Sequence, residues 1–158
     1  VPVLQSYWLP IHVGVSFTAY VLFTLAFVAA VAYLLQERAL TRPARRAWAH
    51  QLPSLETLDN LARRLALVGL AFMTGSLFSG SLWAEQAWGV VWVWEPQQIA
   101  ALVTWCIYAL YFYARHNAHW RDRRAAWLLV IGFISVWITF IGADFMMAGS
   151  RHSFLFGS

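Results

Sequence analysis

The stretch WAEQAWGVVWVWEPQQ (Trp83–Gln98) separates two long apolar runs and contains four of the ten tryptophans of the chain. It also contains two carboxylates, Glu85 and Glu95, together with Gly89 and Pro96. Because proline cannot continue a helix from the preceding turn, we expect a short, partly non-helical segment between two helices. Indoles concentrate at membrane interfaces, since the ring is apolar while its N–H group needs a polar partner. The stretch therefore predicts that the chain leaves a membrane here.

The composition of the 158-residue chain is that of a membrane protein, with 61% hydrophobic residues, 11% charged residues and a mean hydropathy of +0.58. Several apolar runs approach or exceed the roughly 20 residues that a helix needs to cross a bilayer. Unpaired backbone groups are costly in lipid, so each run is expected to be helical. We predict an all-α integral membrane protein, with residues 1–158 as one membrane domain. It would be a bundle of about four transmembrane helices, at residues 12–36, 61–83, 99–114 and 125–147.

The placement of charge predicts the orientation of this bundle. All eleven basic residues are arginine, and ten of them lie in residues 38–64 or 115–124. These segments follow the first and third predicted spans, so the positive-inside rule places both in the cytoplasm. Both termini and residues 83–98 then face outward, as in a multi-pass protein of a bacterial inner (cytoplasmic) membrane. The net charge of +4 is confined largely to those loops, which argues against a nucleic-acid partner.

Two local patterns lie in residues 53–83. Pro53 and Ser54 are typical of a helix start, and Asp59 and Arg63 stand four residues apart, as in an exposed helical ion pair. Small residues then recur at four-residue spacing, which lets helices or a flat ligand approach closely; the pairs are Gly75 with Ser79 and Ser76 with Gly80.

The tryptophans have two interpretations, and composition alone does not separate them. A belt of interfacial indoles needs no binding site. The dense order of Trp88, Trp92 and Trp94 around Gly89, followed at once by Glu95, instead suits a platform for a flat aromatic ligand.

Two histidines indicate what such a ligand could be. His12 lies at the outer end of the first predicted span, and His152 follows the fourth. A pair of neutral imidazoles is a common way to hold haem iron, although each could be an interfacial polar residue. The other three histidines lie among arginines and are expected in solvated loops; they are His50, His116 and His119.

Three stretches resemble the core of the haem-handling cytochrome c assembly proteins, the CcsA/ResC and CcmC group with its tryptophan-rich "WWD" domain. They are LQSYWLPIHV, GSLWAEQAWGVVWVWEPQQIAALVTWCIYALYFYAR and GSRHSFLFG. The resemblance implies a lyase or synthetase core that holds haem b at the outer face for covalent attachment to apocytochrome c. A CcsB/ResB-type partner is also implied. The implied iron ligands are His12 and His152; the implied haem-binding residues are Trp83, Trp88, Trp92, Trp94, Glu95 and Arg151.

The chain also departs from this family. The family has Asp-Pro-Lys-Glu-Thr after the last platform tryptophan, where this chain has EPQQI (residues 95–99) and no lysine. Arg151 is then the only outer cation left for the haem propionates. Tyr113 stands where the synthetase branch has an inner histidine, so we expect at most one haem per chain.

These departures also fit a non-catalytic paralogue that serves as a structural subunit of a larger membrane complex. A third alternative is a b-type electron-transfer protein. Such proteins normally bury their histidines within the spans, whereas His12 and His152 lie at the ends of the predicted spans.

Overall fold

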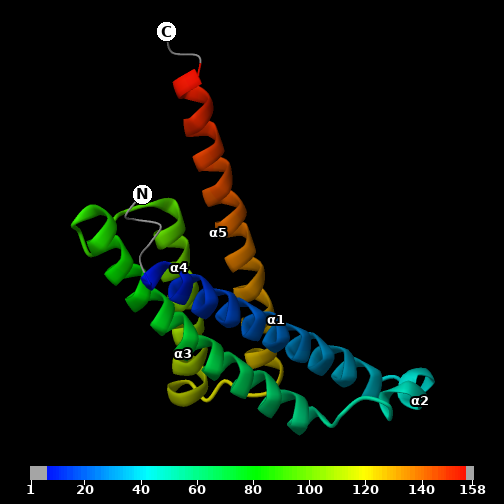
Figure 1. Ribbon diagram of the computed structural model, residues 1–158. Helices are drawn as coiled ribbons and strands as arrows, with labels where there is room; N and C mark the ends of the chain where they lie inside the picture. Colours follow the sequence, from blue (N-terminus) through cyan, green and yellow to red (C-terminus); the bar gives the residue numbers. More distant parts are fainter. Residues whose placement is uncertain (1–6, 156–158) are drawn as a thin grey trace.

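The computed structural model describes residues 7–155, without the side chains of residues 45, 46, 143 and 146–155. The described chain is all-helical, as predicted (Figure 1). Its elements are α1 (Trp8–Leu40), η2 (Pro43–Arg45), α2 (Arg46–Ala49), α3 (Leu55–Trp88), α4 (Pro96–Asn117) and α5 (Arg123–Leu155). Each predicted span lies inside one long helix, and each helix extends beyond the predicted bounds.

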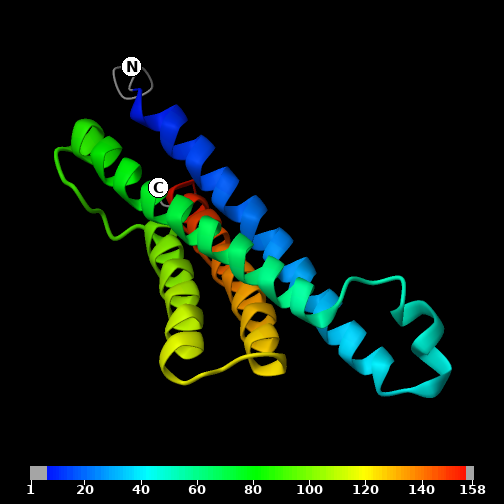
Figure 2. The ribbon, with the colours of Figure 1, turned by 90° about the horizontal axis from the view of Figure 1, so that it is seen from below.

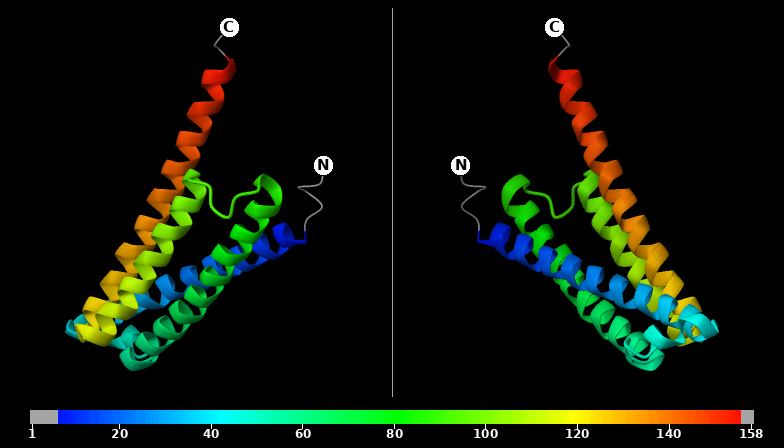
Figure 3. Two further views of the ribbon diagram at one scale, coloured as in Figure 1. Left: turned by 90° about the vertical axis from the view of Figure 1, so that its left-hand side faces the viewer. Right: turned by 90° about the vertical axis from the view of Figure 1, so that its right-hand side faces the viewer.

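The long helices form two antiparallel pairs (Figure 2). In the first pair α1 packs most extensively against α3, and in the second α4 packs against α5; α1 also contacts α5. We call the side that holds residues 38–64 and 115–124 the arginine-rich end, and the opposite side, with residues 83–95, the tryptophan-rich end. The two pairs diverge toward the tryptophan-rich end, where the connection between α3 and α4 crosses the gap (Figure 3).

Local sequence signals explain where α3 and α4 begin and end. The Ser54 side chain caps α3 by accepting a hydrogen bond from the Thr57 backbone N–H at 3.2 Å. At the other end Gly89 adopts a left-handed conformation, with φ of 72°, that glycine tolerates without strain. Pro96 then opens α4 at a position where no N–H group is needed. The tryptophan-rich stretch is therefore helical as far as Trp88, and only residues 89–95 are irregular.

Three described helices are long and apolar enough to cross a membrane, so the protein is a multi-pass membrane protein with three candidate spans. They are α1, α3 and the Arg123–Gly142 part of α5. Helix α4 has 22 residues, a length of roughly 33 Å at 1.5 Å per residue. Glutamines at its start and several tyrosines lower its hydropathy, and it is not among the candidates. A fourth span therefore stays a prediction.

The core is organised around the ring of Phe23 on α1, which is fully buried. It stacks on Tyr108 of α4 with 3.7 Å between ring centroids and 9° between the planes. The same ring lies against Gly69 of α3, where a Cβ atom would come within 2.7 Å of two ring carbons. Three helices thus meet at one side chain, and glycine is needed for the α1–α3 contact.

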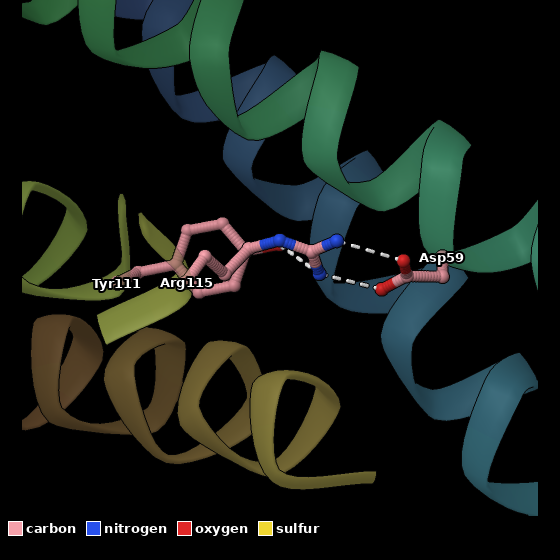
Figure 4. Close-up of polar contacts among 3 residues, drawn as sticks. All are labelled: Asp59, Tyr111 and Arg115. Atoms are coloured by element: carbon pink, nitrogen blue, oxygen red, sulfur yellow. Dashed lines mark hydrogen bonds and ion pairs between the residues drawn. The ribbon is translucent and has the colours of Figure 1, made fainter. Parts of the chain in front are cut away.

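An ion pair joins α3 to α4 at the arginine-rich end (Figure 4). The Arg115 guanidinium donates to both carboxylate oxygens of Asp59, at 2.7 and 2.8 Å, and both side chains are largely buried. These hydrogen bonds raise the pKa of Arg115, so the guanidinium stays charged. The expected Asp59–Arg63 pair is wrong, because the Asp59 carboxylate reaches across to the neighbouring helix instead.

We expect Gly69→Ala to destabilise the protein, because the added methyl group would meet a Phe23 ring that Tyr108 holds in place. Overpacking of this kind typically costs about 1–3 kcal/mol, which outweighs the gain of up to about 1 kcal/mol from alanine in a helix. Thermal unfolding in detergent micelles measures the difference.

Gly14→Ala is the matched control, since a Cβ atom there meets no heavy atom within 4 Å. Its unfolding temperature should stay the same or rise. Equal unfolding temperatures for the two variants would contradict the close packing of Phe23 on α3.

Candidate functional site

A cavity of about 440 Å³ lies at the tryptophan-rich end, between α1, α3 and the start of α4. Its volume is within the roughly 300–1,000 Å³ typical of small-molecule sites. Four of the predicted site residues line it, namely His12, Trp83, Trp92 and Glu95. The remaining lining includes Ser16, Tyr20, Ser76, Gly80, Gln97, Gln98 and Phe140. The walls thus combine apolar surface with a few polar groups, as in most ligand sites.

His12 is held on this wall by a specific hydrogen bond. Its Nδ1 atom lies 2.9 Å from the backbone carbonyl oxygen of Ser76 on α3. A carbonyl oxygen can only accept, so Nδ1 must carry the proton and donate. In the neutral ring Nε2 then keeps its lone pair, which is the form in which a histidine ligates a metal. Metal-ligating histidines commonly donate their other ring N–H to a carbonyl in this way.

The tryptophans divide into two that line the cavity and two that lie outside its lining. Trp83 of α3 and Trp92 of the 89–95 connection line it. Trp88 packs edge-on against Trp83, with centroids 4.9 Å apart, and Trp94 packs edge-on against Trp92 at 5.8 Å. Trp94 is 74% exposed. A ligand in the cavity would therefore meet Trp83 and Trp92 directly, while Trp88 and Trp94 support them.

The connection that carries Trp92 is fixed to α4. The Val93 backbone N–H donates to Oε1 of Gln98 at 3.1 Å, a contact that the sequence analysis did not single out. Trp92 itself has a buried Nε1 atom with no hydrogen-bond partner among the described residues. Glu95 is the N-cap residue of α4, but its side chain makes no capping hydrogen bond and does not accept this N–H.

The two remaining predicted site residues, Arg151 and His152, belong to the last turns of α5. Their side chains lie outside the described part of the chain, so their contacts stay predictions. Among the described lining residues the charged group is Glu95, and no arginine is present.

Sequence reasoning missed Tyr20 of α1 and Phe140 of α5, whose rings meet edge-on at 5.0 Å beside the cavity. Both lie in apolar runs, and no local signal marks them. The small-residue pattern of α3 was visible in the sequence. In the structure Ser76 and Gly80 receive His12 of the neighbouring helix.

A second cavity, of about 860 Å³, lies at the arginine-rich end and is lined largely by charged residues. Tyr113, expected at the position of an inner histidine, is 62% exposed and is not part of its lining. His116 does line it, because α4 continues to Asn117. The expectation that His116 lies in a loop is therefore wrong.

Comparison with known proteins places these features in a family. The model of the "Cytochrome C assembly protein" family matches residues 1–150. A cytochrome c biogenesis protein CcsA of Guillardia theta is 33% identical over 175 residues, covering 98% of this chain and 56% of that protein. The CcsA of Gloeobacter violaceus is 44% identical over 99 residues, covering 63% and 29%. The CcsA of Thermosynechococcus vestitus is 30% identical over 189 residues, covering 98% and 59%.

The chain spans about half the length of most of the curated relatives it matches, at 56% and 59% of two of them. No solved structure matches it. The family match extends from the first residue through the tryptophan-rich stretch and most of α5. The chain therefore belongs to the cytochrome c assembly protein family.

Proposed function

We propose that this chain holds haem b in the cavity at its tryptophan-rich end and presents it for covalent attachment to an apocytochrome c. The observation that carries the proposal is the state of His12. Its Nδ1 is committed to the Ser76 carbonyl, so Nε2 is left as a ligand nitrogen on a cavity wall that also contains Trp83 and Trp92. The relatives are named as cytochrome c biogenesis proteins, which supports the same reading.

The residues of the site fit a flat, mostly apolar ligand with a metal centre. His12 would supply one axial ligand, and His152 of α5 the second. Trp83 and Trp92 would stack on the macrocycle, while Trp88 and Trp94 support them. The propionates would be met by Arg151 and by the lining carboxamide of Gln97.

The contribution of the chain to the chemistry is orientation. Bound haem supplies two vinyl groups, and each adds a cysteine thiol of the apocytochrome, the sulfur to one vinyl carbon and the hydrogen to the other. No nucleophile from this chain is required. Its residues fix the macrocycle so that one edge is presented to both thiols, which raises their effective concentration.

The orientation and partners follow from the same proposal. The arginine-rich end would face the cytoplasm of a bacterial inner membrane, and the tryptophan-rich end would face outward. A CcsB/ResB-type partner would complete the ligase. The competing function is a non-catalytic paralogue with a degraded site, which would bind no haem.

We expect purified protein supplied with haem to show a low-spin bis-histidine absorption spectrum. His12→Ala and His152→Ala should each abolish it, because each removes one axial ligand, and added imidazole should partly restore it. A spectrum unchanged by both substitutions would overturn the ligand assignment, and absence of any haem spectrum would favour the structural subunit.

We expect Trp92→Ala to lower haem occupancy while membrane insertion survives. An aromatic stacking partner is worth about 0.5–1.5 kcal/mol beyond its buried area, so the haem dissociation constant should rise about twofold or more. Trp94→Ala should have a smaller effect, since Trp94 is not part of the cavity lining. Haem titration of each variant gives the constants.

The matched control for these indoles is Trp48→Ala, at the arginine-rich end, where the side chain is 39% exposed. Haem affinity should be unchanged in this variant. Equal losses at Trp48 and Trp92 would instead identify the tryptophans as a membrane belt.

We expect at most one haem per chain, bound at the tryptophan-rich end. Because Tyr113 does not line the cavity at the arginine-rich end, Tyr113→His should not raise the haem-to-protein ratio. His116→Ala should also leave the ratio unchanged. A ratio near two that falls to one in His116→Ala would assign a second haem to that cavity and contradict the prediction.

A further inference from the structure

We propose that three small residues of α3, Ser76, Ser79 and Gly80, form a shelf that positions His12 for iron ligation. The shelf holds the imidazole in a single tautomer and a single orientation before any ligand arrives. The inference rests on the proposed function for its purpose, but the state of His12 that it assigns belongs to the protein without haem.

The first element of the shelf is the backbone carbonyl of Ser76. It accepts the Nδ1–H of His12 at 2.9 Å and the hydroxyl of Ser79 at 3.1 Å. A carbonyl oxygen has no proton to give, so in the alternative tautomer, with the proton on Nε2, the lone pair of Nδ1 would point at the lone pairs of the oxygen. The contact therefore selects the Nδ1–H form, which directs ligation to Nε2.

The second element is Gly80, one turn after Ser76. A Cβ atom at this position would lie 2.9 Å from Cε1 of His12 and 3.1 Å from its Nδ1. Real side chains do not approach so closely, so any residue larger than glycine would displace the imidazole. Glycine is unfavourable inside a helix, and its presence here is explained by the room that it leaves for the ring.

The third element fixes the register of the two helices. The Ser16 hydroxyl, one turn after His12, donates to the His12 backbone carbonyl at 2.6 Å. Its oxygen lies 2.5 Å from the hydroxyl of Ser76. Because the Ser16 proton is already donated, the Ser76 hydroxyl must donate to Ser16. These two hydroxyl hydrogen bonds hold α1 and α3 in the register that places His12 Nδ1 next to the Ser76 carbonyl oxygen.

The consequence is a ligand that does not have to be ordered when the iron arrives. A histidine free to rotate would lose conformational freedom on binding, whereas His12 has already lost it on folding. Ser76, Ser79 and Gly80 thus act as positioning residues, and of these four residues only His12 would touch the iron.

The test uses Gly80→Ala, with Gly75→Ala on the same helix as the matched control. A Cβ atom at Gly75 makes only an ordinary contact, 3.4 Å from Cγ1 of Val15. The first measurement is the ¹⁵N spectrum of ring-labelled histidine in haem-free protein, recorded in mildly alkaline buffer. Wild type and Gly75→Ala should show His12 protonated on Nδ1 alone, and Gly80→Ala should show a mixture of tautomers.

The second measurement is haem titration of the same variants. Loss of a group that orients a metal ligand typically costs about 10–100-fold in affinity, so Gly80→Ala should bind haem at least about tenfold more weakly. Added imidazole should restore the low-spin spectrum of Gly80→Ala. Gly75→Ala should match wild type.

A second variant, Ser16→Ala, removes a hydroxyl without adding volume. It should show the same mixture of His12 tautomers, and it provides the test if Gly80→Ala does not fold.

The outcomes separate the shelf from the proposed function. His12 protonated on Nε2, or exchanging between tautomers, in wild-type protein overturns the shelf whatever haem does. An unchanged tautomer in both Gly80→Ala and Ser16→Ala also overturns it. The expected tautomers without haem binding in any variant would support the shelf and refute haem binding as its purpose.

Discussion

Apolar contact gives little driving force between helices in lipid, where the surrounding chains are equally apolar, so close packing and polar links must hold a bundle together. In this protein the close packing is between α1 and α3. Gly69, Ser76 and Gly80 are spaced by seven and four residues and so share one face of α3. Phe23 lies against the first and His12 against the other two. The contact that builds the core therefore also builds one wall of the cavity.

Polar links then decide where the two helix pairs meet and where they part. Arg115 of α4 is bonded to Asp59 of α3 at the arginine-rich end, and Trp105 of α4 donates its indole N–H to Thr74 of α3 at 2.9 Å, farther along. Beyond Thr74 the 89–95 connection links the two helices, and Figure 3 shows them diverging there. The cavity lies in this diverging part, between α1, α3 and the start of α4.

Much of the fold could be predicted from the sequence, since apolar runs, Ser54, Gly89 and Pro96 are local signals for helices and their ends. The partner of Asp59 could not, because Arg63 and Arg115 are equally good partners until α4 is placed beside α3. The site shows the same limit. The small-residue spacing of α3 was readable, but whether a helix or a ligand would use it depended on His12, which is 64 residues away from Ser76. His116 was misplaced because one additional turn of α4 carries it from a loop to a cavity wall.

The hydrogen bond from Val93 to Gln98 has a mechanical consequence. It ties the residue next to Trp92 to α4, whereas Trp83 is part of α3, which packs against α1. The two indoles that line the cavity are therefore carried by different helix pairs, so the distance between them depends on the angle between the pairs. A flat, rigid ligand in contact with both indoles would therefore fix the angle between the helix pairs.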